Sequence, residues 1–381
     1  MDALDLLSGD AQAFFAEVWA SRVHIHKPDA DELTALLSLD DADALLTSTA
    51  LRTPALRVAQ DGTVLPSSSY TRQATIAGAS VTGLVDARKV VALFESGATL
   101  VLQGLHRYWP PLTRLIRDLE RRLGHPCQAN AYLTPPGAQG FALHSDTHDV
   151  FVFQTYGAKQ WEVHDRGTEL DVLMEAGTSM YLPAGTPHAA RTQGTASLHV
   201  TVGINQTSYR EALRRVVEGV LEDLEYGDRL PAGYLDEPGA LESGLQEKVA
   251  TLADRLRGLD PVALADSEAT RFLTTRSPVL RGGIVDALAA GHIDDETVLA
   301  RRPGALCVVR APRAGDARLT LLLADRQLRM PAHLEDVLRR LASLAPDEQL
   351  RPADLADWLD PQSRAVLTRR LVREGFLRVA A

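Results

Sequence analysis

Short apolar runs broken by glycine and proline follow one another between residues 128 and 206, and they constrain the fold more than any other feature of this chain. Each run has the length of one strand, and turn-forming residues separate neighbouring runs. Strands of this size with turns between them are typical of an antiparallel sandwich or barrel. We therefore predict an antiparallel β domain in this segment, with strands at 129–133, 150–155, 159–163, 179–182 and 197–204.

Helical patterns lie on both sides of this segment. Apolar residues recur at helical spacing over 10–20 and 111–123 before it, and over 213–224 and 241–256 after it. The chain closes with a helical pattern over 364–373, a glycine at 375 and a strand-like run that ends at Val379. This order of helix, glycine and strand is typical of the end of a winged-helix domain. The sequence therefore predicts an α+β protein.

The length of the chain predicts more than one domain. A chain of 381 residues exceeds what one ordinary hydrophobic core organises. The changes of pattern place the expected domains at 1–207, 208–275 and 276–381. The two helices expected in the middle segment can bury one apolar stripe and leave another for a partner helix. A homodimer is therefore expected.

Composition restricts partners and location. The net charge of −10, from 40 basic and 50 acidic residues, argues against general nucleic-acid binding. Residues 331–381 carry eight arginines and eight acidic residues, so direct DNA binding by the terminal domain is not expected either. No run approaches the roughly 20 apolar residues of a membrane span, and the first residues do not read as a secretory leader. Two distant cysteines fit a reduced, cytoplasmic setting.

The segment His144-Ser145-Asp146 and the later His188 form the strongest functional pattern. Residues two apart share one face of a strand, so His144 and Asp146 are expected to point the same way. The turn at 183–187 can direct the His188 imidazole toward them. Two imidazoles and one carboxylate occupy one face of an iron(II) octahedron and leave the other face open for a co-substrate and dioxygen. We predict that these three residues are the metal ligands and the catalytic centre.

Two other interpretations stay open at this point. His148 falls on the same face of the expected strand, so a zinc site of His144, His148 and His188 is conceivable. A surface strand with polar side chains and an unrelated loop histidine would also explain the pattern. Iron bound with Asp146 is preferred because this set leaves three positions for a chelating oxo-acid and oxygen.

Further polar residues near the motif are candidates for binding a co-substrate. Lys159 opens an apolar strand, where a buried ammonium needs an anion such as the distal carboxylate of a metal-bound dicarboxylate. A solvent-facing lysine that protects a strand edge is the alternative. Asn130 and Tyr132 share a strand face and offer hydrogen-bonding groups for a carboxylate, and Thr201 is a further candidate. His199 is left out of the metal set as a packed or supporting histidine.

At these positions the sequence resembles the JmjC ribosomal oxygenases, the "cupin 4" group, which hydroxylate ribosomal proteins on arginine or histidine. One departure is visible, because the chain has Gly177-Thr-Ser-Met where the family commonly has Gly-Asp before its Tyr-Leu/Ile-Pro. The resemblance rests on the motif around 144–146 and on the segments Asn130-Ala-Tyr-Leu-Thr-Pro-Pro-Gly, Asp149-Val-Phe-Val-Phe-Gln, Gly157-Ala-Lys-Gln-Trp, Tyr181-Leu-Pro and Ser197-Leu-His-Val-Thr.

The resemblance implies a double-stranded β-helix of the cupin/JmjC type with N-terminal helices, a helical dimerisation region and a C-terminal winged-helix domain. It implies Fe(II) bound by the three predicted ligands, 2-oxoglutarate paired with Lys159 near Asn130 and Tyr132, and O2 as the oxidant. The implied activity is hydroxylation of an arginine or histidine of a ribosomal protein. The alternative is a tailoring hydroxylase of a natural-product peptide or small molecule. A non-catalytic interaction protein and a cupin hydrolase or isomerase are rivals from other classes.

Overall fold

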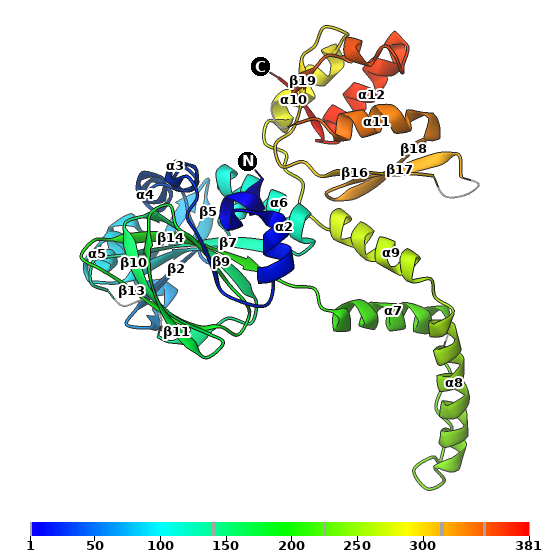
Figure 1. Cartoon of the computed structure of the whole chain (residues 1–381), viewed down its shortest axis with the longest axis horizontal. Coiled ribbons are helices and arrows are strands. Elements are labelled where there is room, and N and C mark those ends of the chain that lie inside the picture. Colours follow the sequence, from blue (N-terminus) through cyan, green and yellow to red (C-terminus); the bar gives the residue numbers. More distant parts are fainter. Residues whose placement is uncertain (1, 139–141, 225, 313–315, 346–347, 381) are drawn as a thin grey trace. The chain divides into compact units, whose positions relative to one another are not determined.

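The protein is described here from a computed structural model, which covers all residues except 1, 139–141, 225, 313–315, 346–347 and 381. The described residues form two compact units, Met1–Gln206 and Thr207–Ala381 (Figure 1). None of the described helices combines the length and the apolar character that a membrane crossing demands.

Two antiparallel sheets form the centre of the first unit (Figure 1). The larger sheet has the strand order β1-β12-β9-β14-β7-β6-β2-β3, and the smaller sheet has the order β11-β10-β13-β8. The strands of the larger sheet are β1 (His24–His26), β2 (Leu56–Gln60), β3 (Thr63–Val64), β6 (Thr99–Leu102), β7 (Cys127–Thr134), β9 (Asp149–Tyr156), β12 (Ser179–Leu182) and β14 (Ser197–Ile204). Those of the smaller sheet are β8 (His144–Ser145), β10 (Ala158–Asp165), β11 (Thr168–Glu175) and β13 (Pro187–Thr192).

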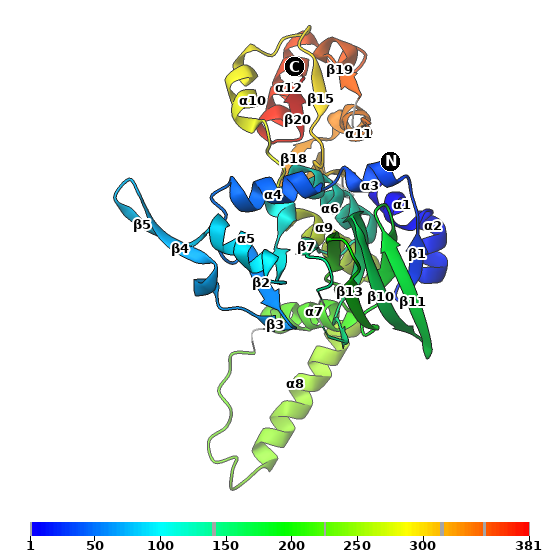
Figure 2. The same ribbon diagram turned by 90° about the vertical axis from the view of Figure 1, so that its left-hand side faces the viewer.

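The antiparallel β domain predicted for residues 128–206 is confirmed, and all five predicted strands are present as β7, β9, β10, β12 and β14. The larger sheet nevertheless recruits β1, β2, β3 and β6 from earlier in the chain. β1 falls within residues 22–26, where the sequence alternates like a short strand, whereas β2, β3 and β6 were not predicted. A separate hairpin of β4 (Thr71–Ile76) and β5 (Ala79–Val85) extends from this unit (Figure 2).

The pleat of the larger sheet gives its two faces different roles. On β7, Ala131 packs into the main core together with the helices, whereas the neighbouring Tyr132 lines a pocket. On β14, Val200 belongs to the same core, and His199 and Thr201 line the pocket. Alternation with a period of two therefore separates core residues from pocket residues along each strand.

Helices cover the core face of the larger sheet. They are α1 (Ala3–Ser8), α2 (Ala11–Ala13) with a π-helical turn over Phe14–Val18, α3 (Ala30–Thr34), α4 (Leu39–Thr47), α5 (Ala87–Glu95) and α6 (Pro110–Leu123). The helix predicted over 111–123 is confirmed as α6, which starts with a proline in its first turn and ends at Gly124 with a φ of 69°. The helix predicted over 10–20 is shorter than expected, because the π-helical turn ends at Val18.

The second unit begins with three helices, α7 (Tyr209–Asp223), α8 (Gly239–Arg257) and α9 (Pro261–Thr274). The first two were predicted, and a capping box between Ser208 and Glu211 starts α7. The prediction for this segment missed α9, whose apolar residues Val262, Leu264 and Phe272 make a weaker helical pattern. No residue of α8 is buried.

The rest of the second unit folds around its own core. Its elements are α10 (Gly283–Ala289), β15 (Leu299–Arg301), β16 (Cys307–Arg310), β17 (Arg318–Leu323), β18 (Arg326–Pro331), α11 (Glu335–Ala342), β19 (Gln349–Leu350), α12 (Pro361–Arg373) and β20 (Leu377–Val379). Two three-stranded sheets have the orders β19-β15-β20 and β16-β17-β18. The predicted final helix and terminal strand are confirmed as α12 and β20. Gly375 lies between them and has a φ of 80°.

Candidate metal centre

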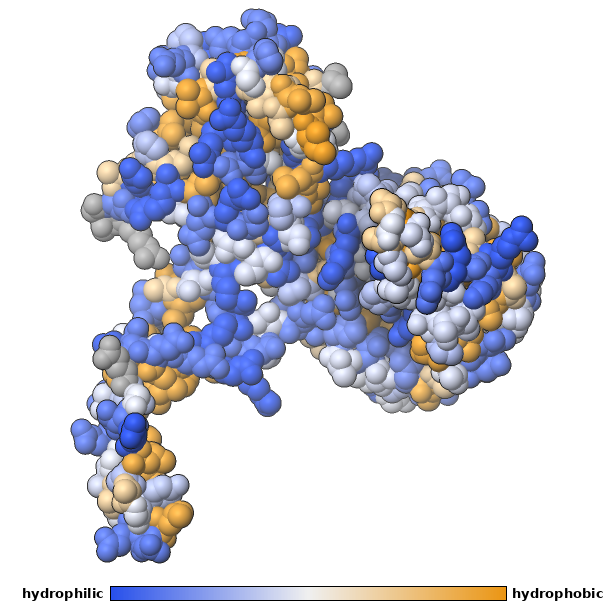
Figure 3. Space-filling view, turned by 180° about the vertical axis from the view of Figure 1, so that it is seen from behind, coloured by the Kyte–Doolittle hydropathy of each residue, from blue (hydrophilic) through white to orange (hydrophobic). Residues whose placement is uncertain are grey.

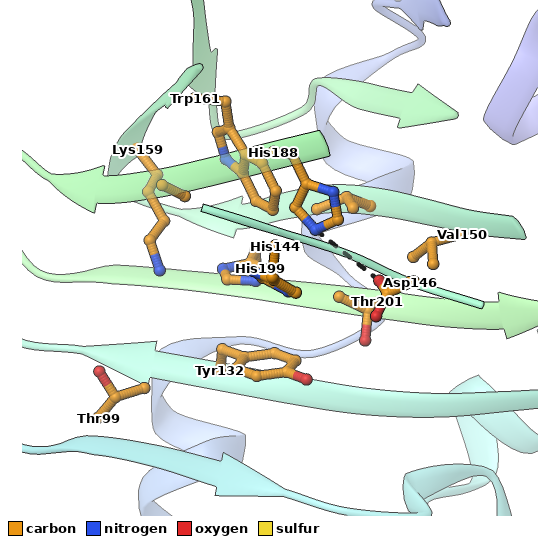
Figure 4. Close-up of a pocket in the computed structure, with 12 residues that line it drawn as sticks. Thr99, Tyr132, His144, Asp146, Val150, Lys159, Trp161, His188, His199 and Thr201 are labelled. Carbon is orange, nitrogen blue, oxygen red and sulfur yellow. Dashed lines mark ion pairs between the residues drawn. The ribbon is translucent and has the colours of Figure 1, made fainter. Parts of the chain in front are cut away.

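His144 and His188 lie opposite each other on adjacent antiparallel strands, β8 and β13. Their ring centroids are 4.5 Å apart. Asp146 follows directly after β8, and its Oδ2 lies 3.8 Å from Nε2 of His188 (Figure 4). Each of the three residues offers one ligand atom, and these atoms lie within 4.8 Å of one another. Pairing between strands thus assembles two nitrogens and one carboxylate at a single point.

Hydrogen bonds set which nitrogen of each imidazole is available. Nδ1 of His144 lies 2.8 Å from the carbonyl oxygen of Ala142, and Nδ1 of His188 lies 3.0 Å from that of Thr186. A carbonyl oxygen can only accept, so each Nδ1 carries the proton and each Nε2 keeps its lone pair in the neutral ring. Burial lowers the pKa of His188, which favours that neutral form. Both rings are therefore prepared to donate Nε2 to a metal ion.

His148 lies apart from this group. Its Nε2 is 2.6 Å from the place where a Cβ on Gly203 would be, so the imidazole occupies the space above that glycine. Among the described residues, the group with converging ligand atoms consists of His144, Asp146 and His188. This arrangement favours the carboxylate-containing set over the three-histidine zinc set.

A pocket between the two sheets contains the three candidate ligands (Figure 4). Lys159, Trp161 and His188 enter it from the smaller sheet, whereas Tyr132 and Thr201 enter it from the larger sheet. The complete lining is Thr99, Tyr132, His144, Asp146, Val150, Val152, Lys159, Trp161, His188, Ala190, His199 and Thr201.

Lys159 is the charged residue at the inner part of this pocket. Its side chain is 2% exposed, and Nζ donates a hydrogen bond of 3.2 Å to Oγ1 of Thr134. None of the described carboxylates forms an ion pair with it. Burial lowers the pKa of Lys159 from 10.5 to about 8. A buried ammonium with one neutral partner is a site that an anion would stabilise.

Two buried ring nitrogens also face this pocket. Among the described residues, Nε1 of Trp161 and Nδ1 of His199 have no hydrogen-bond partner. His199 stacks on Tyr132 with ring centroids 4.9 Å apart, and burial, followed by the charge of Lys159, lowers the pKa of His199 well below its usual value. Buried polar atoms without partners are uncommon in folded proteins, so these two atoms are candidates for hydrogen bonds to a bound polar ligand.

The remaining predicted residues differ in their placement. Tyr132 and Thr201 line the pocket, and burial raises the pKa of Tyr132 although the charge of Arg57 opposes the rise. Asn130 is not among the lining residues. Its Oδ1 accepts a hydrogen bond of 3.0 Å from the backbone N–H of Gly104.

Sequence reasoning did not assign a role to Thr99 or Trp161, although both line the pocket. Thr99 belongs to β6, which was not predicted as a strand of the sheet. Trp161 lies two residues after Lys159 on the same strand. Residues two apart on a strand share a face, and the same rule that grouped Tyr132 with Asn130 could have grouped Trp161 with Lys159.

Comparison with known proteins identifies the domain that carries this site. Residues 107–212 match the family model described as JmjC domain. The chain is 34% identical over 197 residues to "Bifunctional lysine-specific demethylase and histidyl-hydroxylase NO66" of Branchiostoma floridae, covering 47% of this chain and 32% of that protein. It is 27% identical over 356 residues to "Ribosomal oxygenase 1" of Danio rerio, covering 81% of this chain and 63% of that protein. The chain thus spans less than two thirds of the length of either relative.

The fold has a neighbour among solved structures. Escherichia coli ribosomal oxygenase YcfD matches with a TM-score of 0.56 and 18% sequence identity over 97% of this chain and 98% of that chain. Another structure of YcfD, in complex with cobalt and 2-oxoglutarate, matches with a TM-score of 0.55. Residues 107–212 are therefore similar to a JmjC domain, the chain is similar in sequence to proteins named ribosomal oxygenases, and its fold is similar to that of YcfD.

Proposed function

We propose that this chain is an Fe(II)- and 2-oxoglutarate-dependent oxygenase that hydroxylates an arginine or histidine side chain of a ribosomal protein. One observation carries the proposal. Two imidazoles with available Nε2 atoms and one carboxylate share a pocket with a buried ammonium. The relatives named as ribosomal oxygenases, and the YcfD structure with cobalt and 2-oxoglutarate, support the same activity.

The donor set fits iron(II). Two neutral imidazoles and one carboxylate are the ligands of the facial triad of non-haem iron oxygenases, which leaves positions for other ligands. Asp146 is partly exposed, whereas His188 is only 6% exposed. The protein therefore surrounds the metal site on the side of His188, and a substrate can reach the site from the side of Asp146.

The same pocket fits 2-oxoglutarate. This dicarboxylate needs a metal for its keto acid end and a cation for its distal carboxylate. Lys159 provides the cation, and Nε1 of Trp161 and Nδ1 of His199 are unpartnered polar atoms in the same pocket. We propose that Tyr132 and Thr201 border the bound co-substrate. Asn130 stays a prediction, because its side-chain oxygen is already bonded to Gly104.

When bound, Fe(II) and 2-oxoglutarate supply, with O2, the oxidation that converts a C–H bond to an alcohol and releases succinate and carbon dioxide. The chain supplies geometry. His144, Asp146 and His188 hold the metal on one face, and Lys159 orients the co-substrate through its distal carboxylate. The apolar side chains of Val150 and Val152 exclude water from the reacting centre.

Anaerobic addition of Fe(II) and 2-oxoglutarate to the purified protein tests this activity without a substrate. A visible charge-transfer band is expected when both are present, and it should be absent with either one alone. A protein that binds the metal but never gives the band, and never consumes 2-oxoglutarate, would contradict the oxygenase assignment and leave the cupin hydrolase or isomerase and the non-catalytic interaction protein.

Mass spectrometry of ribosomal proteins incubated with the loaded enzyme tests the substrate. Addition of one oxygen atom to an arginine or histidine of one protein is expected. If 2-oxoglutarate turnover is intact and no ribosomal protein gains oxygen, the natural-product tailoring hydroxylase becomes the better assignment.

We further propose the division of the chain into a catalytic domain at 1–207, a helical dimerisation region at 208–275 and a winged-helix domain at 276–381. The terminal segment contains a small sheet, β19-β15-β20, together with α10 and α12, which supports the winged-helix assignment. Cytoplasmic location and the absence of direct DNA binding stay predictions from the sequence.

Exposed apolar side chains on the middle helices support the homodimer. On α8, Leu245 is 49% exposed and Val249 is 61% exposed, one helical turn apart. Figure 3 shows exposed apolar atoms along this helix, at the lower left. We expect that Leu245→Glu combined with Val249→Glu converts a dimer to a monomer in light scattering after gel filtration. The exposed Ser243→Glu on the same helix should leave the dimer intact, and a wild-type monomer at micromolar concentration contradicts the proposal.

A further inference from the structure

Asp149 is a buried carboxylate that is close in sequence to the metal centre and is not one of the three candidate ligands. It begins β9, three residues after Asp146, and is 1% exposed. Its Oδ1 accepts a hydrogen bond of 2.7 Å from the backbone N–H of Ala184, and its Oδ2 accepts a short hydrogen bond from the hydroxyl of Tyr181. Burial of a carboxylate is costly unless such donors satisfy it, so the position of Asp149 is tied to both partners.

The Ala184 contact lies in the turn that leads to His188. The turn closes with a hydrogen bond of 3.1 Å from the N–H of Thr186 to the carbonyl of Pro183. The carbonyl of Thr186 in turn accepts the Nδ1–H of His188. The backbone of this turn, together with these hydrogen bonds, therefore connects the Asp149 carboxylate to the His188 imidazole.

A second bond ties the same turn to the first two ligands. The N–H of Gly185 donates a hydrogen bond of 2.8 Å to the backbone carbonyl of Asp146. Ala184 and Gly185, which are adjacent in the turn, are thus held by Asp149 and Asp146, which belong to the segment that carries His144. The two bonds together set the distance between the two parts of the ligand set.

Aromatic rings hold the Tyr181 hydroxyl in place over Asp149. Tyr181 is fully buried, and the N–H of Ala20 donates a hydrogen bond of 3.0 Å to its hydroxyl oxygen. Phe14 meets its ring edge to face at 4.9 Å, and Trp19 stacks on it at 6.1 Å. Burial and the hydrogen bond to Asp149 raise the pKa of Tyr181, so the hydroxyl stays protonated and remains a donor.

We propose that Asp149 is a positioning residue of the metal centre, which holds the 183–186 turn so that His188 meets His144 and Asp146 at one ion. It is outside the group of described residues with converging ligand atoms, so it acts through the turn and not on the metal. This inference rests on the proposed metal site. Groups that orient metal ligands typically contribute about 10- to 100-fold to metal affinity.

Titration of the metal-free protein with Mn(II) alone tests this role. Asp149→Asn keeps the size of the side chain but removes its charge, and should raise the Mn(II) dissociation constant about 10- to 100-fold. Tyr181→Phe removes one of the two donors to the carboxylate, and should raise the dissociation constant roughly two- to tenfold by the same mechanism. A purely structural role would lower the thermal midpoint of the metal-free protein and leave the dissociation constant of the folded protein unchanged.

Asp286→Asn is the matched control. Asp286 is 4% exposed and, like Asp149, accepts from one backbone N–H, that of Val379 at 2.9 Å, and from one side chain, the guanidinium of Arg302. It belongs to the other compact unit, so its substitution should destabilise that unit without changing Mn(II) affinity.

The possible results separate this inference from the proposed function. If the wild-type protein binds no Mn(II), the metal site and this inference fall together. If the wild type binds Mn(II) and folded Asp149→Asn binds it within about twofold of the wild-type constant, the metal site stands and the positioning role is wrong. If Asp149→Asn does not fold, Tyr181→Phe decides, and an unchanged dissociation constant in that variant overturns the inference.

Discussion

Replacement of Lys159 by methionine should have opposite effects on stability and on co-substrate binding. The ammonium is 2% exposed and has only the Thr134 hydroxyl as a partner among the described residues. Methionine has nearly the same length and no charge. The variant should therefore unfold less readily than the wild type in the absence of 2-oxoglutarate. It should also bind 2-oxoglutarate at least about 30-fold more weakly. Without the ammonium, the distal carboxylate of 2-oxoglutarate is buried without a partner, which makes the binding free energy less favourable by roughly 2 kcal/mol or more.

The size of the stability gain follows from the pKa of Lys159. Burial lowers it from 10.5 to about 8, and this difference corresponds to about 3 kcal/mol of destabilisation of the charged form. Loss of the hydrogen bond to Thr134 offsets about 1 kcal/mol of the gain. A net increase of about 2 kcal/mol in the free energy of unfolding is expected at pH 7.

The gain should disappear at high pH. Below pH 8 both the folded and the unfolded chain carry the ammonium, so the wild type bears the full cost. Between about pH 8 and 10.5 the unfolded chain binds the proton and the folded chain does not, so the free energy of unfolding of the wild type rises with pH. Above pH 10.5 the cost is gone, and the methionine variant should no longer be the more stable protein.

Tryptophan fluorescence during urea denaturation can follow this transition. Three of the four tryptophans, Trp19, Trp109 and Trp161, belong to the first compact unit. Lys89→Met is the matched control, because Lys89 is exposed and its Nζ also has one neutral partner, the carbonyl of Thr71 at 2.9 Å. The control should change stability by less than about 0.5 kcal/mol. A Lys159→Met variant that is less stable than the wild type at pH 7 would refute the argument that the ammonium is uncompensated.

Two other substitutions test the site and the turn before Lys159. Asp146→Ala should abolish 2-oxoglutarate turnover coupled to substrate and weaken Mn(II) binding by more than about 100-fold. The control Asp171→Ala, at an exposed position on β11, should change neither property. Retained activity in Asp146→Ala would remove Asp146 from the ligand set. Gly157→Ala should lower the free energy of unfolding by more than about 2 kcal/mol, because φ is +65° and its Cβ would lie 1.9 Å from a backbone oxygen. Gly124 has a φ of +69°, and no atom lies within 4 Å of the position that its Cβ would take. Gly124→Ala should therefore lower the free energy of unfolding by only about 1 kcal/mol in the same denaturation assay. Equal losses of stability in the two variants would contradict the steric clash at Gly157.

Local patterns in the sequence were sufficient for the elements whose signals are local. The apolar spacing of α6 and the alternation along β7 and β14 depend on residues a few positions apart, so they are visible without a structure. The His144-Ser145-Asp146 motif is visible for the same reason. The very short strands β2, β3 and β6 were not, because a few residues form a strand only when a neighbouring strand supplies the hydrogen bonds.

The sequence alone determined the donor types of the site and the helical segments on either side of the β domain. Only the tertiary structure decided the pairing of His144 with His188 across β8 and β13, and the contact that draws His148 to Gly203. It also decided that Lys159 is buried without a carboxylate partner among the described residues. The physical reason is that strand register and burial depend on residues far apart in the chain, whereas periodicity depends on neighbours.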